Sequence, residues 1–123
     1  MGFAERRKIL KEKNFLELRP SPLYESSIDD KKNVTILIPK FKKKLFIKFI
    51  NPLLKSPDIK LKLDELGSAV WILMNGKNTV EDISLILQNQ FGKSEESIEE
   101  RLLKFLTELY IQKLITFEEI KGV

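Results

Sequence analysis

Apolar residues recur at helical spacing shortly after the middle of the chain. Between residues 64 and 74 they fall at positions i, i+3, i+4, i+7 and i+8, which places them on one face of a helix. The carboxylate of Asp64 can accept a backbone N–H of the first turn, and Asn75-Gly76 is a typical helix end. The pattern predicts a helix over residues 64–74 with the buried stripe Leu66, Ala69, Val70, Leu73 and Met74.

The same periodicity predicts two further helices. Thr79 and Asp82 have the spacing of a capping box, so the second helix is expected over residues 79–91. The third is expected over residues 95–113, and glutamates fill its first turns, where the helix dipole favours negative charge. Its apolar residues are more numerous than one buried face needs: Ile98, Leu102, Phe105 and Leu109, with Leu103, Leu106 and Tyr110 beside them.

Strand patterns occupy the front half of the chain. Residues 34–38 are β-branched except for Leu37 and are followed by a proline, and residues 59–63 alternate apolar and basic side chains. Residues 23–25 are predicted as a first short strand, with a polar hairpin loop at 29–33. The order of elements predicts an α+β fold of the winged helix-turn-helix kind, a three-stranded antiparallel sheet followed by three helices. A last strand is predicted at 115–118.

The N-terminal region is predicted to be an extension of this domain. Residues 2–13 have the pattern of a charged helix that is too short to be stable alone, so it either docks on the domain or frays. Pro20 and Pro22 are interpreted as ending regular structure. We therefore expect an N-terminal helical extension over residues 1–19 and one domain over residues 20–120.

A lysine- and phenylalanine-rich segment, residues 40–56, is predicted as an insertion in that domain. Its apolar and lysine residues separate on a helical projection, which predicts a short helix around residues 42–50, broken near Pro52. Three interpretations stand: a solvated loop, a contact with a protein partner, and a membrane-surface contact through residues 40–55, since basic amphipathic segments bind interfaces.

Several phrases, in their order and spacing, resemble the PqqD family of peptide chaperones. They are Lys62-Leu63-Asp64-Glu65, Asn75-Gly76-Lys77-Asn78-Thr79-Val80, Phe91-Gly92, and Glu100-Arg101-Leu102-Leu103-Lys104-Phe105-Leu106 followed by Leu109 and Leu114-Ile115. The resemblance covers residues 59–115, and residues 20–40 loosely, as two strands. The chain departs from compact members in its N-terminal helix and in its long 40–56 connection.

The resemblance implies three antiparallel strands followed by three helices, a winged helix-turn-helix relative. It also implies a non-catalytic module without a cofactor. Such a module holds the leader of a ribosomally made precursor peptide as an added strand, between the third strand and the third helix. It presents that peptide to a modifying enzyme, which in the namesake pathway is a radical-SAM protein.

The residues themselves fit that mechanism. An edge strand leaves backbone N–H and C=O groups unpaired, and an extended peptide can complete the ladder. Lysines on the strand suit an acidic leader, and surplus apolar residues on the third helix can line a groove. The predicted peptide-binding residues are Ile59, Lys60, Leu61, Lys62, Leu102, Leu103, Leu106 and Tyr110. The simpler interpretation is that the apolar ones are core and the lysines are solvated.

Composition argues against an enzyme. The chain has no cysteine and no histidine, which removes thiolate chemistry, the commonest general base and the commonest metal ligand. It also lacks a glycine-rich phosphate-binding loop. We therefore predict no catalytic residues and no metal site, and the resemblance to the PqqD family implies no cofactor.

Two other function classes stand as alternatives. A winged-helix protein with a basic isoelectric point near 9.2 can bind nucleic acid. The start of the third helix argues against this, because Glu95, Glu96, Glu99 and Glu100 would repel phosphate in the major groove. The second alternative is a structural subunit that holds another protein permanently. With no long apolar run and a charged N-terminus, the protein is expected to be cytoplasmic.

Overall fold

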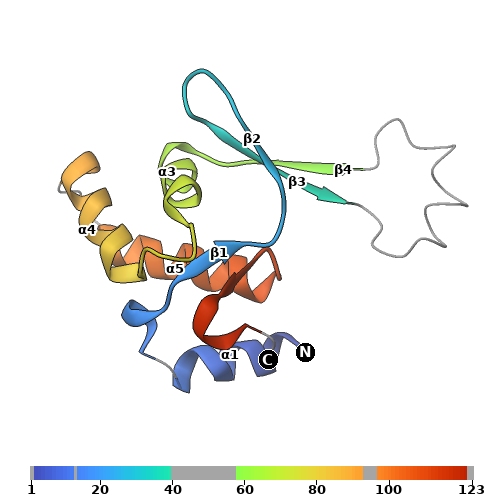
Figure 1. The fold of residues 1–123 in the computed structure, drawn as a ribbon, viewed down its shortest axis with the longest axis vertical. Helices are drawn as coiled ribbons and strands as arrows, with labels where there is room; N and C mark the ends of the chain where they lie inside the picture. The colour runs from blue at the N-terminus through green and yellow to red at the C-terminus, as the bar shows by residue number, and fades with distance from the viewer. Residues whose placement is uncertain (1, 13, 40–57, 93–96, 122–123) are drawn as a thin grey trace, which may run out of the picture. The chain divides into compact units, whose positions relative to one another are not determined.

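The structure is a computed structural model that describes residues 2–12, 14–39, 58–92 and 97–121 (Figure 1). The chain forms two compact units, one made of Met1–Leu23 with Ala69–Val123 and the other of Tyr24–Ser68. The predicted insertion, its helix at 42–50 and its membrane contact at 40–55 lie outside the described residues. The division into residues 1–19 and 20–120 stays a prediction.

The unit Tyr24–Ser68 contains a three-stranded antiparallel sheet. Its strands are β2 (Ser26–Ile28), β3 (Val34–Pro39) and β4 (Asp58–Lys62), and they lie in the order β2-β3-β4 (Figure 1). Helices follow the sheet along the chain, so the predicted α+β architecture is confirmed. The two longer strands lie where the sequence predicts them. The first strand does not, because residues 23–25 lie outside any strand.

The hairpin turn explains the position of β2. The carboxylate of Asp29 accepts the backbone N–H groups of Lys31 and Asn33, each at 2.9 Å, and Lys32 takes a positive φ of 64°. The hydrogen bond from the backbone N–H of Asn33 is the main cause of the lowered pKa of Asp29. This turn places Ile28 opposite Val34, so pairing begins directly beside the loop and occupies residues 26–28.

The other unit is mainly helical. Its elements are α1 (Phe3–Glu12), a 3₁₀ turn η1 (Phe15–Glu17), β1 (Pro20–Pro22), most of α3 (Glu65–Leu73), α4 (Val80–Phe91), α5 (Ile98–Ile111), β5 (Ile115–Phe117) and a 3₁₀ turn η3 (Glu118–Ile120). The predicted capping box is confirmed: Thr79 Oγ1 accepts the Asp82 N–H and Asp82 Oδ2 accepts the Thr79 N–H, both at 3.0 Å. Asp64 also caps α3 as predicted, because its carboxylate accepts the Gly67 N–H at 2.7 Å.

The prediction that Pro20 and Pro22 end regular structure is wrong. They begin and end β1, which pairs antiparallel with β5, with Ser21 opposite Thr116. On either side of this strand, the Glu118 N–H donates to the Arg19 carbonyl at 2.9 Å and the Leu23 N–H donates to the Leu114 carbonyl at 3.0 Å. These two bonds determine which residues of β1 face β5 and which face away. Both prolines therefore occupy positions whose backbone faces away from β5, where a missing N–H removes no ladder bond.

An arginine helps to dock the N-terminal helix on its unit. The Nε of Arg6 donates to the Tyr110 carbonyl at 2.7 Å, and its guanidinium carbon lies 3.8 Å from the centroid of the Tyr110 ring. Its Nη2 donates to the Ile115 carbonyl at 3.5 Å. Arg6 is buried by this contact with α5 and β5. Of the two predicted outcomes, docking is the one that the structure shows.

Candidate functional site

β4 is an edge strand of the three-stranded sheet. It pairs with β3 on one side, and no strand in the described part of the chain pairs with its other side. β2 is the opposite edge, but it has three residues whereas β4 has five. An unpaired edge of that length is a template on which an extended chain can add.

The register of the sheet shows which backbone groups of β4 face outward. The N–H of Leu63 donates to the carbonyl of Val34 at 2.9 Å, so residue 63 faces β3. Because facing alternates along an antiparallel strand, Leu61 and Ile59 also face β3, opposite Ile36 and Ile38. The backbone N–H and C=O groups of Lys60 and Lys62 therefore point to the open side.

The two faces of β4 differ in chemistry. Directly opposed residues share a face of a sheet, so Ile59 and Leu61 lie on the face of Ile38 and Ile36. Ile36 is fully buried, but Ile59 and Leu61 are 48% and 38% exposed. Lys60 and Lys62 occupy the other face and are exposed. The apolar side of this strand is thus only partly covered, although alternation of this kind is typical of a strand with one face buried.

Three of the predicted α5 residues are buried. Leu102, Leu106 and Tyr110 are 1%, 0% and 2% exposed. Tyr110 packs on the ring of Phe117, with centroids 5.3 Å apart, and under Arg6. The wide apolar stripe of α5 is therefore accounted for by packing against α1, α4 and β5. Peptide contact by these three residues stays a prediction, and it requires their side chains to leave the core.

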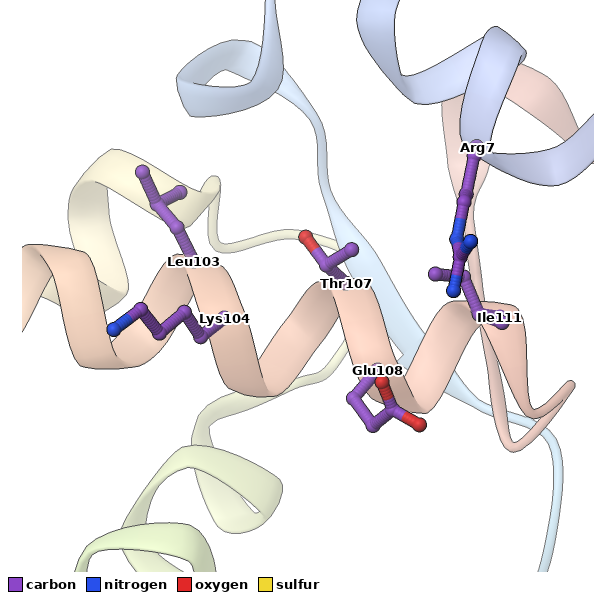
Figure 2. A pocket seen from close by; sticks show the side chains of 6 residues that line it. All are labelled: Arg7, Leu103, Lys104, Thr107, Glu108 and Ile111. Carbon is purple, nitrogen blue, oxygen red and sulfur yellow. The ribbon is translucent and has the colours of Figure 1, made fainter. Parts of the chain in front are cut away.

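Leu103 is the accessible one of the four predicted α5 residues. It is half-buried and lines a shallow hollow of about 410 Å³ in the helical unit. Arg7 of α1 reaches toward Ile111 at one end of this hollow, and Leu103 lies at the other (Figure 2). Lys104, Thr107 and Glu108 complete its lining. A second hollow of about 270 Å³ shares Arg7 and Thr107 with it and is lined also by Leu10, Lys11 and Phe15.

The predicted residues thus fall in two places. The β4 residues belong to the unit Tyr24–Ser68, and the α5 residues belong to the helical unit. The contribution of α1 to the hollow at Leu103 was missed, because Arg7 is one of several charged residues on a short helix. Nothing in its spacing distinguishes it from the buried Arg6 beside it.

The described residues offer no metal-binding cluster. No group of three or more aspartate, glutamate, histidine or cysteine side chains is arranged there to hold a metal ion. In the same part of the chain, no helix has the length and apolarity to cross a membrane.

These observations define a class: an α+β domain whose three-stranded antiparallel sheet ends in an open edge strand and is followed by helices. Residues 56–115 match the family model described as Coenzyme PQQ synthesis protein D (PqqD). This match supports a PqqD-like protein, and the matched region runs from β4 through α5 to the start of β5. Searches of curated proteins and of solved structures found no match to this chain.

Proposed function

We propose that this protein is a non-catalytic module that binds the leader of a ribosomally made precursor peptide and presents it to a modifying enzyme, a radical-SAM protein in the namesake pathway. The observation that carries the proposal is the open side of β4, where Lys60 and Lys62 present their backbone groups. The family match supports it, because this strand lies inside the matched residues.

Strand addition gives affinity without any catalytic residue. Each new backbone hydrogen bond contributes about 0.5–1.5 kcal/mol net, and two outward-facing residues supply two donors and two acceptors. The partly exposed Ile59 and Leu61 add apolar surface that a bound strand can cover. A short edge with these groups suits an extended peptide better than a folded partner.

The first turn of α5 supports the peptide over nucleic acid. Glu99 and Glu100 lie there, at the end of the helix that a winged-helix protein would place in the major groove. Two carboxylates at that position repel phosphate, so the proposal does not extend to sequence-specific DNA binding.

The test is a proline substitution on the outward-facing backbone. Lys60→Pro removes one donor from the open side and no bond to β3, whereas Lys60→Ala removes the side chain and keeps the donor. We expect Lys60→Pro to weaken binding roughly tenfold more than Lys60→Ala does. The assay is fluorescence anisotropy with labelled peptides tiling the short reading frames beside the gene, after circular dichroism has verified folding.

Participation of α5 is tested separately with Leu103→Glu, because Leu103 lies in the other unit. Glutamate keeps a similar helix propensity and adds a charge to a half-buried position. Reduced affinity would assign α5 to the binding surface. Unchanged affinity in both Lys60→Pro and Leu103→Glu would contradict the proposed site and direct attention to residues 40–56.

A further inference from the structure

The backbone of β4 can pair with any extended peptide, whereas the side chains of β4 favour particular peptide sequences. On the basis of the proposed function, we propose that the bound segment alternates apolar and acidic residues, with its carboxylates opposite Lys60 and Lys62. The inference concerns one strand of the unit Tyr24–Ser68 and follows from the register of its sheet.

The geometry of an added strand fixes which positions meet. Lys60 and Lys62 face outward, so they form the hydrogen-bonded pairs with an antiparallel peptide. The peptide residues in those pairs lie about 5.5 Å away, measured between Cα atoms, and their side chains share the face of the lysines. The residues between them share the face of Ile59 and Leu61, at the closer non-hydrogen-bonded spacing of about 4.5 Å.

The lysine face requires negative charge. Among the described residues, neither Lys60 nor Lys62 forms an ion pair. Their direct neighbours across β3 are Leu37 and Thr35, which carry no charge. Opposite charges directly across a strand pair are stabilising and like charges are destabilising. Two acidic residues, two positions apart in the peptide, therefore complement this face, and two basic residues oppose it.

The opposite face requires apolar side chains. It runs from the buried Val34 and Ile36 on β3 outward to Ile59 and Leu61, which are about half uncovered. An apolar peptide residue placed beside Ile59 or Leu61 continues this surface and removes apolar area from water. A charged residue there would lose water without gaining a partner. The two faces together favour a peptide in which acidic and apolar residues alternate. A peptide that is only negatively charged overall would not complement both faces.

The probes are four synthetic labelled peptides of equal length with glycine-serine ends. Three have alternating cores of valine with glutamate, threonine or lysine, and the fourth has the valines and glutamates of the first in two separate blocks. We expect the alternating glutamate peptide to bind best, about tenfold tighter than the lysine peptide. The blocked peptide should bind more weakly than the alternating one, and 1 M salt should reduce the effect of charge.

A charge-reversed protein sharpens the test. Lys60→Glu with Lys62→Glu should reverse the order, so that the alternating lysine peptide binds best. The control is Lys8→Glu with Lys77→Glu, which makes the same change of net charge at exposed positions outside the sheet. It should keep the original order, because the preference is local and does not follow from the overall positive charge.

The outcomes separate the two proposals. Equal binding of all four peptides that is still abolished by Lys60→Pro would overturn the alternation and leave strand addition intact. The alternation would also be overturned, with strand addition left intact, if the control variant changed the order of peptide affinities as much as the β4 variant does. Binding of the peptides with no sensitivity to Lys60→Pro, or no binding of these or the leader fragments, would overturn strand addition itself.

Discussion

Among its described residues the chain contains two antiparallel sheets. Their edge strands β1 and β4 carry different residues at the positions whose backbone faces away from the paired strand. β1 carries prolines at the positions that face away from β5, and the Pro20 carbonyl there accepts the Gly76 N–H at 3.0 Å. β4 carries lysines at the equivalent outward positions, with no strand of the described chain beside them. Proline and lysine both discourage edge-to-edge association. Only lysine keeps its backbone donor, so of these two strands β4 is the one that remains able to accept a further strand.

The same contrast holds for the side chains. On β5, Ile115 and Phe117 are fully buried, and the Phe117 ring meets those of Phe15 and Tyr110 at centroid distances of 5.6 Å and 5.3 Å. On β4, the apolar residues are substantially exposed. The β1–β5 ribbon is therefore expected to stabilise the fold, whereas β4 leaves apolar surface for a ligand.

The largest expected effect on stability comes from removing the aromatic ring of Phe117 on β5. Phe117→Ala deletes a fully buried aromatic side chain and both ring contacts, so we expect the free energy of unfolding to fall by about 3–5 kcal/mol. Ile59→Ala, on the exposed strand, should cost about 1 kcal/mol or less. Urea denaturation followed by circular dichroism measures both. Similar losses for the two variants would remove the distinction.

A smaller effect is expected from prolines on the two sides of β4. Leu61→Pro removes an N–H that faces the Ile36 carbonyl in the ladder with β3, which should cost about 1–3 kcal/mol of unfolding free energy. Lys62→Pro removes an N–H that faces the open side and should change stability by about 0.5 kcal/mol. The comparison uses the same denaturation assay. A larger loss for Lys62→Pro would show that the inward and outward positions are assigned the wrong way round.

The smallest expected effect is on acid stability. Burial raises the pKa of Glu119, but hydrogen bonds from the Arg19 Nε at 2.6 Å and the Arg19 backbone N–H at 2.7 Å outweigh it, so the pKa lies below its ordinary 4.5. Asp29 at the β2–β3 turn is likewise below its ordinary 3.8. Carboxylates with lowered pKa stabilise the folded state above these ordinary values and lose that contribution as pH falls through the lowered ones.

Melting temperature measured against pH checks this. Glu119→Gln and Asp29→Asn should each make the fall in melting temperature below about pH 4.5 less steep than in the unmodified protein. The change should be modest, because the Arg19–Glu119 pair is largely exposed and water weakens it. A steeper fall in either variant would contradict the sign of the pKa shift.

The helices and the central strands could be predicted because their signals are local. The capping residues Asp64, Thr79 and Asp82 contact backbone within three residues of themselves, and the structure shows each of these bonds. Likewise, the polar loop at 29–33 predicts the hairpin, although the geometry of its turn moves the first strand to Ser26.

What the sequence does not show are pairings between distant residues. Pro20 and Pro22 indicate a break when considered locally, and they become acceptable only once β5 supplies the register. Arg6 contacts Tyr110 and Ile115, which are 104 and 109 positions away, and no local pattern marks it. At the candidate site, the alternation on β4 identified the strand, but the exposure of Ile59 and Leu61 depends on what covers that face.

The separation between Arg6 and its partners also constrains when the protein can be completed during translation. The unit Tyr24–Ser68 is continuous in the chain, so all its strands exist once residue 68 has been synthesised. The helical unit combines both ends of the chain, and α1 and β1 have no partners until α5 and β5 are made. Since domains fold as the chain emerges, β4 is available at its edge before the N-terminal segment can dock. The nascent protein therefore has its proposed peptide-binding strand while its helical unit is still unfinished.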